Sequence, residues 1–189
     1  MLGMRPFFNQ IVGLIALFYH NVAEMKTGES KTLTATLPMY LHGLMGPGNY
    51  LITANAYLAN RDAQNIGVVY EWLGLTVAIG TMLDEKDNPD RDKNTLYQAD
   101  IIYTTNSALG FDYLFDNLAA TPADQAIQGF NFALIDEIDA VLLDMAQTPL
   151  VISGAPRVQS NLYGLANTMI HKLGQTTDIG QSNDQKKFG

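Results

Sequence analysis

Two segments decide the fold of this chain: Met25-Lys26-Thr27-Gly28-Glu29-Ser30-Lys31-Thr32 and, about a hundred residues later, Leu134-Ile135-Asp136-Glu137-Ile138-Asp139. A short glycine-containing loop that ends in Lys-Thr at the start of a helix is typical of one half of a nucleoside-triphosphate site. Its backbone N–H groups and its lysine contact the phosphates, and its threonine hydroxyl contacts Mg²⁺. An apolar strand that ends in Asp-Glu is typical of the other half, where the aspartate holds the metal ion and the glutamate orients or deprotonates water. Both segments, in this order, indicate a nucleoside-triphosphate-driven motor domain.

The rest of the chain alternates between strand patterns and helix patterns. Strands are predicted at Asn21–Lys26, Tyr50–Thr53, Leu75–Ile79, Ile101–Thr104, Phe132–Ile135 and Thr148–Gly154. Helices are predicted at Lys31–Leu44, Ala56–Leu73, Ala108–Asn117 and Val158–Leu173. Continuous apolar strands that alternate with helices are typical of an α/β fold with a parallel sheet covered on both faces. Ligands of such sheets bind outside the carboxyl ends of the strands, where both half-sites lie.

The length of 189 residues fits one domain with a sizeable core. We expect residues 1–150 to form a partial motor domain and residues 151–173 to begin a second unit. Residues 174–189 are polar and are expected to be disordered. The segment Asp84–Lys93 mixes both charges around Asn88-Pro89 and is expected to be a surface loop.

The apolar run Ile11–Tyr19 follows one arginine and resembles the core of a signal peptide. It is far shorter than the roughly twenty residues that a membrane helix needs. The prediction is a helix buried in the core of a globular domain.

Composition excludes several classes of function. The net charge of −8 argues against a large nucleic-acid surface, because such a surface needs clustered basic residues. No cysteine is present, so disulfides and cysteine-ligated metal sites are excluded. The histidines His20, His42 and His171 lack metal-ligand spacing and are interpreted as structural or solvated.

Several further segments resemble one family, the SecA preprotein-translocase ATPases, over roughly residues 2 to 173. The resemblance is to their first nucleotide-binding domain, a DEAD-type half of a RecA-like motor. The matching segments are Leu2–Arg5 with Gln10, Ala23–Glu29, Lys31–Thr34, Thr53–Asn55, Tyr57–Ala59, Arg61–Ala63, Tyr103 with Thr105-Asn106, Gly110–Leu114, Asp116-Asn117, Ile135–Asp139 and Gln147–Gly154. Gly-Phe-Asp-Tyr-Leu and Thr-Pro-Leu-Val-Ile-Ser-Gly are specific to this family among related motors. Other parts are similar to the accessory SecA type of some Gram-positive bacteria.

The resemblance implies a role for each matching residue. Gln10 would read the adenine, with Arg5 nearby, and Glu137 would be the catalytic base. Asp136 and Thr32 would hold Mg²⁺. The phosphate loop would consist of Gly28, Glu29, Ser30, Lys31 and Thr32. ATP and Mg²⁺ are the implied cofactors.

The resemblance also implies partners and a location. The partners are a preprotein, a membrane channel of the SecY type and, for the longer protein, an anionic membrane surface, but no nucleic acid. The location is the cytoplasmic side of the bacterial plasma membrane, with peripheral attachment.

Three departures from the family pattern affect the expected activity. Ser30 stands where the family has glycine, and a left-handed backbone there would cost serine about 1–2 kcal/mol. The chain begins at the adenine motif, and it stops just inside the inserted preprotein-binding domain, before the second motor half; residues from Gly174 do not match the family pattern. We therefore expect a fragment that binds ATP weakly and hydrolyses it negligibly.

Two other functions remain open from the sequence. One is a nucleic-acid helicase of the same motor superfamily, which the acidic balance and the Gly110–Leu114 segment disfavour. The other is a non-catalytic ATPase remnant that acts as a binding module, which Ser30 favours.

Overall fold

The computed structural model describes residues 3–26, 28–81, 92–152 and 167–172. The chain divides into two compact units, Met1–Ile152 and Ser153–Gly189. Within the second unit, residues 167–172 are helical.

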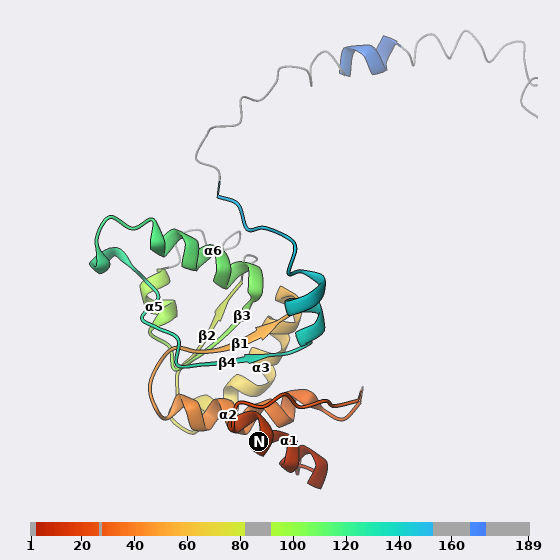
Figure 1. Ribbon diagram of the computed structural model, residues 1–189, viewed down its shortest axis with the longest axis vertical. Coiled ribbons are helices and arrows are strands. Elements are labelled where there is room, and N and C mark those ends of the chain that lie inside the picture. Colours follow the sequence, from red (N-terminus) through yellow and green to blue (C-terminus); the bar gives the residue numbers. More distant parts are fainter. Residues whose placement is uncertain (1–2, 27, 82–91, 153–166, 173–189) are drawn as a thin grey trace, which may run out of the picture. The chain divides into compact units, whose positions relative to one another are not determined.

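A parallel four-stranded sheet lies at the centre of the first unit (Figure 1). The strands are β1 (Asn49–Thr53), β2 (Val77–Gly80), β3 (Ile101–Thr105) and β4 (Phe132–Ile135), in the spatial order β2-β3-β1-β4. β1 pairs with β3 on one side and with β4 on the other. All residues of β1 and β3 are buried, as expected for strands with neighbours on both sides and helices on both faces. β2 and β4 are the edges.

Helices cover both faces of the sheet. Their bounds are α1 (Phe8–Phe18), α2 (Lys31–Gly43), α3 (Ala56–Trp72), α5 (Lys93–Tyr97) and α6 (Asn106–Asn117), with short turns η1 (Pro122–Asp124) and η2 (Ala140–Asp144). α3 begins at Asn55, whose side chain accepts the N–H of Leu58, and α6 begins at Thr105, whose hydroxyl accepts the N–H of Ala108. Both caps directly follow a strand, so each chain reversal occurs at the carboxyl edge of the sheet.

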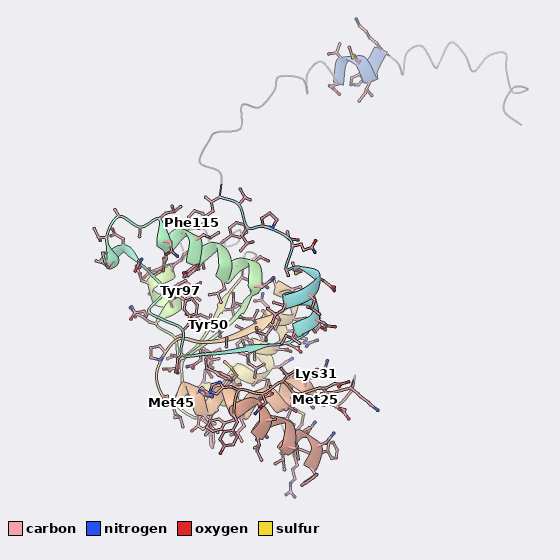
Figure 2. The ribbon with its side chains drawn as sticks, viewed as in Figure 1. Met25, Lys31, Met45, Tyr50, Tyr97 and Phe115 are labelled. Carbon is pink, nitrogen blue, oxygen red and sulfur yellow. The ribbon has the colours of Figure 1, made fainter. Side chains whose placement is uncertain are left out.

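Two apolar clusters fill the space between sheet and helices. The first joins α2 and α3 to one face through Met39, Ile66 and Tyr70, and Leu17 of α1 packs against it. The second joins α5 and the segment after α6 to the other face through Tyr50, Tyr97 and Ile102. Figure 2 shows Tyr50 and Tyr97 together on the α5 side, with Lys31 on the other side of the sheet. The nucleotide segments therefore lie on the α1–α2 side.

The expected α/β class and parallel sheet are confirmed, and four predicted strands match β1–β4 to within a few residues. Two predicted strands are wrong. Residues 21–26 contain no strand, because no neighbouring strand pairs with them, although they run past the free edge of β4. Residues 148–152, the described part of Thr148–Gly154, are likewise not a strand and lie largely exposed.

The prediction for the N-terminal apolar run is half right. The run is helical, but α1 is not buried in the core, because Gln10 and Gly13 are its buried residues. Phe8, Val12 and Ile15 are exposed on the outer face. The inner face contacts α2 instead. In the described part of the chain, no helix is both long enough and apolar enough to cross a membrane.

Other predictions fall wholly or partly outside the described residues. The tail 174–189, most of the Asp84–Lys93 loop and most of the Val158–Leu173 helix lie there. Lys93 itself begins helix α5, which the sequence did not predict.

Candidate functional site

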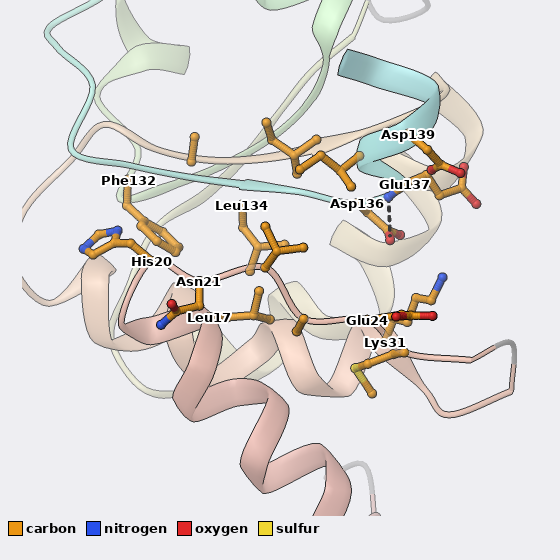
Figure 3. Close-up of a pocket in the computed structure, with 16 residues that line it drawn as sticks. Leu17, His20, Asn21, Glu24, Lys31, Phe132, Leu134, Asp136, Glu137 and Asp139 are labelled. Atoms are coloured by element: carbon orange, nitrogen blue, oxygen red, sulfur yellow. Dashed lines mark hydrogen bonds between the residues drawn. The ribbon is translucent and has the colours of Figure 1, made fainter. Parts of the chain in front are cut away.

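A groove of about 550 Å³ runs along the free edge of β4. One wall consists of residues 132–139, which are β4 and its continuation, and the other consists of residues 20–25 and Lys31. Figure 3 shows Lys31 and Glu24 on the wall opposite Asp136 and Glu137. The two sequence segments that predict the site therefore meet at one end of this groove.

A smaller pocket of about 70 Å³ continues beneath that end. Lys31, Thr32 and Asp136 line it together with the buried carboxylate Asp62. The pocket thus contains the Lys31 ammonium, the Thr32 hydroxyl and the Asp136 carboxylate. It lies at the carboxyl ends of the strands, where parallel sheets bind their ligands.

The phosphate loop enters α2 through a left-handed residue. Ser30 has φ 56° and ψ 60° and directly precedes Lys31, the first residue of the helix. Gly28 has φ 88°, which glycine adopts without a steric penalty. The left-handed backbone costs serine roughly 1–2 kcal/mol. Glycine, which the family has at this position, adopts the same backbone without that cost.

Glu29 ties the phosphate loop to its surroundings. Its carboxylate accepts the backbone N–H of Lys26 at 2.8 Å and the side-chain amide of Asn9 at 3.4 Å. Its backbone carbonyl accepts the side-chain amide of Gln10 at 2.7 Å. Gln10 also accepts the N–H of Phe7 at 2.8 Å, which caps α1. The loop is thereby held to the N-terminal turn of α1.

Gln10, which the family resemblance assigns to the adenine, does not line the groove. Its exposed fraction is 2%, and it is absent from both sets of lining residues. Its amide is occupied by Phe7 and Glu29, so it supports the loop from behind. Arg5 is exposed in the segment before α1.

The other wall contains a second strained turn. Asp136 remains in the β1 ladder, because its N–H donates to the carbonyl of Ile52 at 2.9 Å. Glu137 then adopts φ 55°, and its N–H donates to the Asp136 carboxylate at 3.0 Å. The π-helical turn η2 begins three residues later, at Ala140. Left-handed residues and π-turns are concentrated at functional sites in proteins.

The donor set fits Mg²⁺ bound together with phosphate. Mg²⁺ takes one or two carboxylates and keeps several waters and substrate oxygens, so it needs no cage of acidic residues. Asp136 and the Thr32 hydroxyl supply such a set. The described residues contain no group of three or more acidic, histidine or cysteine side chains that could hold a metal without phosphate.

Sequence reasoning missed three residues of the groove. Glu24 lines it beside Lys31, and Asp62 lines the deeper pocket with one carboxylate oxygen 2.8 Å from the Arg61 guanidinium. His20 lines the opposite end and contacts the ring of Phe132. Glu24 and Asp62 lie in segments that match the family, which is the signal that could have pointed to them, whereas His20 lies in no matching segment.

His42 fills the floor behind His20. Its ring stacks on Phe132 with 3.8 Å between ring centroids. Both ring nitrogens are buried, and neither forms a hydrogen bond to a residue that the structure describes. Burial therefore lowers the pKa of His42, although the nearby Phe18 carbonyl opposes the shift.

A comparison of the sequence with models of protein families gives one match. A family model described as the SecA DEAD-like domain matches residues 1–187. The match extends through the polar tail, so the expectation that residues from Gly174 depart from the family is wrong.

Relatives and solved structures agree with that match. The protein translocase subunit SecA 2 of Pediococcus pentosaceus is 57% identical over 98% of this chain and 23% of its own length. The subunits of the same name from Streptococcus sanguinis and Streptococcus gordonii are 53% and 55% identical over 99% of this chain. The chain spans about a quarter of the length of these relatives.

A hypothetical ATP-dependent RNA helicase from Sulfolobus tokodaii superposes with a TM-score of 0.54 over 77% of this chain and 40% of its own, at 19% identity. This similarity shows the fold alone. The family model and the sequence relatives together settle the family: the chain belongs to the SecA DEAD-like domain family.

Proposed function

We propose that this chain is the ATP-binding part of a protein-translocation motor that drives preprotein export across the bacterial plasma membrane. The observation that supports it most directly is the shared groove, in which Lys31 of the phosphate loop faces Asp136 and Glu137 at the end of β4. The printed name of its relatives, protein translocase subunit SecA 2, supplies the biological context.

The proposed roles follow from the charge and position of each side chain. The Lys31 ammonium neutralises phosphate charge, and Gly28, Glu29 and Ser30 present backbone N–H groups to the same oxygens. Thr32 and Asp136 hold Mg²⁺. Glu137 orients or deprotonates the attacking water. Gln10 and Arg5 are the proposed contacts of the adenine, and Gln10 can make this contact only if ATP releases it from Glu29.

The proposed partners are a preprotein and a membrane channel of the SecY type, with cytoplasmic location and peripheral attachment to an anionic membrane. Hydrolysis requires a second motor half that closes over the nucleotide. Without it, water is poorly excluded and no arginine reaches the γ-phosphate, which costs on the order of 10³–10⁵ in rate. The isolated chain is therefore expected to bind ATP weakly and to turn it over negligibly.

A binding module without catalysis is the second candidate, and the left-handed Ser30 favours it. The helicase alternative rests on a similarity of fold alone. The net charge of −8 disfavours a nucleic-acid surface.

The test places the 189 residues into the Pediococcus relative, in exchange for the part that they match. ATP hydrolysis and preprotein transport into channel-bearing membrane vesicles are then measured for this chimera, for its Glu137→Gln variant and for the isolated chain. We expect activity in the chimera, loss in Glu137→Gln and negligible phosphate release by the chain alone. Turnover near 1 per second by the isolated chain contradicts the proposed dependence on a second half. Hydrolysis by the chimera that needs RNA instead of preprotein supports the helicase.

A further inference from the structure

Two carboxylates are buried in the described part of the chain, and they differ in how completely they are hydrogen-bonded. Both oxygens of Asp112 accept a hydrogen bond, one from Lys93 and the other from the Tyr97 hydroxyl. At Asp62, both contacts of the neighbouring Arg61 guanidinium are made to the same oxygen, Oδ1. No residue that the structure describes donates to its Oδ2. A buried carboxylate oxygen without a donor is costly, so Oδ2 needs a partner of another kind.

The contact with Arg61 does not explain why Asp62 is buried. The side chain of Arg61 is 44% exposed, so water can solvate its guanidinium without a buried partner. An ion pair is weak evidence of a gain in stability when its carboxylate has lost its hydration. An unsatisfied buried polar group is commonly explained by a catalytic role or by bound water. The burial of Asp62 therefore points to a role beyond the Arg61 contact.

Asp62 lines the same small pocket as the proposed metal ligands. Lys31, Thr32, Asp62 and Asp136 are the polar lining of this pocket of about 70 Å³, and its other lining residues are apolar. The volume accommodates a few water molecules, each of which needs two or more polar partners. Among the described residues, no direct hydrogen bond joins Asp62 to Thr32 or Asp136. Water in the pocket can therefore connect the free oxygen of Asp62 to those two groups.

The chemistry of a metal-bound hydroxyl requires such a connection. A threonine hydroxyl has one proton to donate and lone pairs to offer, so when a lone pair faces a metal ion the O–H must donate to an acceptor elsewhere. Outer partners of this kind orient metal ligands, and their removal typically lowers metal affinity roughly 10–100-fold. Oδ2 of Asp62 is an acceptor of this kind in the pocket that Thr32 lines.

We propose that Asp62 is a positioning residue of the metal site. Its Oδ2 holds water in the pocket, and this water accepts the hydrogen bond of the Thr32 hydroxyl. Thr32 and Asp136 are thereby fixed in the orientation that binds Mg²⁺, whereas Asp62 itself does not contact the metal ion. The inference rests on the proposed ATP site and extends that site to helix α3.

Calorimetric titration of the chain with ATP, with and without Mg²⁺, tests the proposal. The quantity compared is the Mg²⁺ effect, which is the ratio of the two ATP affinities. Asp62→Asn still offers Arg61 an oxygen but turns an NH₂ donor toward the pocket, where the proposal needs an acceptor. We expect the Mg²⁺ effect to fall about 10-fold or to vanish, while the ATP affinity without Mg²⁺ does not fall. Asp112→Asn, the matched control, should lower the melting temperature and leave the Mg²⁺ effect unchanged.

Three results overturn the proposal. An equal Mg²⁺ effect in the wild type and in Asp62→Asn overturns it alone, since ATP binding is then intact. An equal loss of ATP affinity with and without Mg²⁺ in Asp62→Asn means that Asp62 only supports the fold of the site. A wild-type chain that binds no ATP overturns the proposed function and this inference together.

A second variant answers the same question if Asp62→Asn does not fold. Asp62→Glu keeps a carboxylate for Arg61, but its extra methylene takes the space of the water in the pocket. The same selective fall in the Mg²⁺ effect is expected, and an unchanged Mg²⁺ effect in Asp62→Glu overturns the proposal.

A double-mutant cycle tests the route through Thr32. Thr32→Val removes the hydroxyl and keeps the shape of the side chain. If Asp62 acts through that hydroxyl, Asp62→Asn lowers the Mg²⁺ effect no further in the Thr32→Val background. Fully additive losses in the double variant overturn the route and assign the effect of Asp62 to its charge alone.

Discussion

The two halves of the sheet differ in what borders them. The β2-β3-β1 half is covered by α3, α5 and α6, and the residues of β1 and β3 are all buried. The β4 half borders an open groove, which Lys31, Asp136 and Glu137 line. The three described non-glycine residues with positive φ, His20, Ser30 and Glu137, all lie along or beside this groove. We infer that the β2-β3-β1 half supplies most of the stability, whereas the β4 half holds strained backbone at the proposed site.

The largest effect on stability is expected at Asn49, at the start of β1. Its buried side chain donates to the carbonyls of Gly46 and Asp100 and accepts the amide of Asn131, which joins three segments. Asn49→Ala leaves these groups unpaired and should lower the free energy of unfolding by about 2–4 kcal/mol in a urea titration. Asn117→Ala, at an exposed position, should cost less than about 0.5 kcal/mol. Similar losses in both variants would show that the buried bonds of Asn49 are not a main source of stability.

A smaller loss is expected where α5 meets α6. The Tyr97 hydroxyl donates to the buried carboxylate of Asp112 at 2.6 Å, and Lys93 pairs with the same carboxylate. Burial, with the adjacent Asp112, raises the pKa of Tyr97, so the hydroxyl stays protonated as a donor. Tyr97→Phe should cost about 1–2 kcal/mol in unfolding free energy. Tyr113→Phe is the exposed control; an unchanged Tyr97→Phe would mean that Lys93 alone satisfies Asp112.

In the strained phosphate loop, a substitution is expected to raise the free energy of unfolding instead of lowering it. Ser30→Gly removes the left-handed penalty and should raise the free energy of unfolding by about 1 kcal/mol. It should also tighten ATP binding in calorimetry without restoring hydrolysis by the isolated chain. A destabilised Ser30→Gly variant would mean that the serine side chain stabilises the loop more than its backbone strains it.

The smallest effect concerns pH. Burial holds the pKa of His42 below its ordinary 6.5, so the unfolded chain binds the proton first as pH falls. His42 therefore favours the folded state above pH 6.5 and loses that contribution as pH drops from 6.5 toward the lowered pKa. His42→Phe, which keeps a ring against Phe132, should flatten the difference in stability between pH 7 and pH 5. Parallel pH profiles of the two proteins would contradict this origin.

The sequence predicted which residues meet at the site better than it predicted the shape of the site. The Lys31-Thr32 and Asp136-Glu137 pairs are readable because each follows a fixed motif at a strand or helix end. Local periodicity also predicted β1–β4. It failed at Asn21–Lys26, since a strand needs a paired neighbour, which a sequence window does not show. The family resemblance assigned Gln10 to the adenine, and nothing in the local sequence reveals its bonds to Phe7 and Glu29.

The central claim is that the two walls of the groove together bind ATP with Mg²⁺, and calorimetric titration of the chain with ATP tests it most directly. Titrations with and without Mg²⁺ compare the wild type with Lys31→Ala, Asp136→Asn and the control Lys26→Ala. We predict weak binding that Mg²⁺ strengthens, on the order of 100-fold weaker in Lys31→Ala and unchanged in Lys26→Ala. Asp136→Asn should lose the effect of Mg²⁺. Equal ATP affinity in the wild type, Lys31→Ala and Asp136→Asn would contradict the claim.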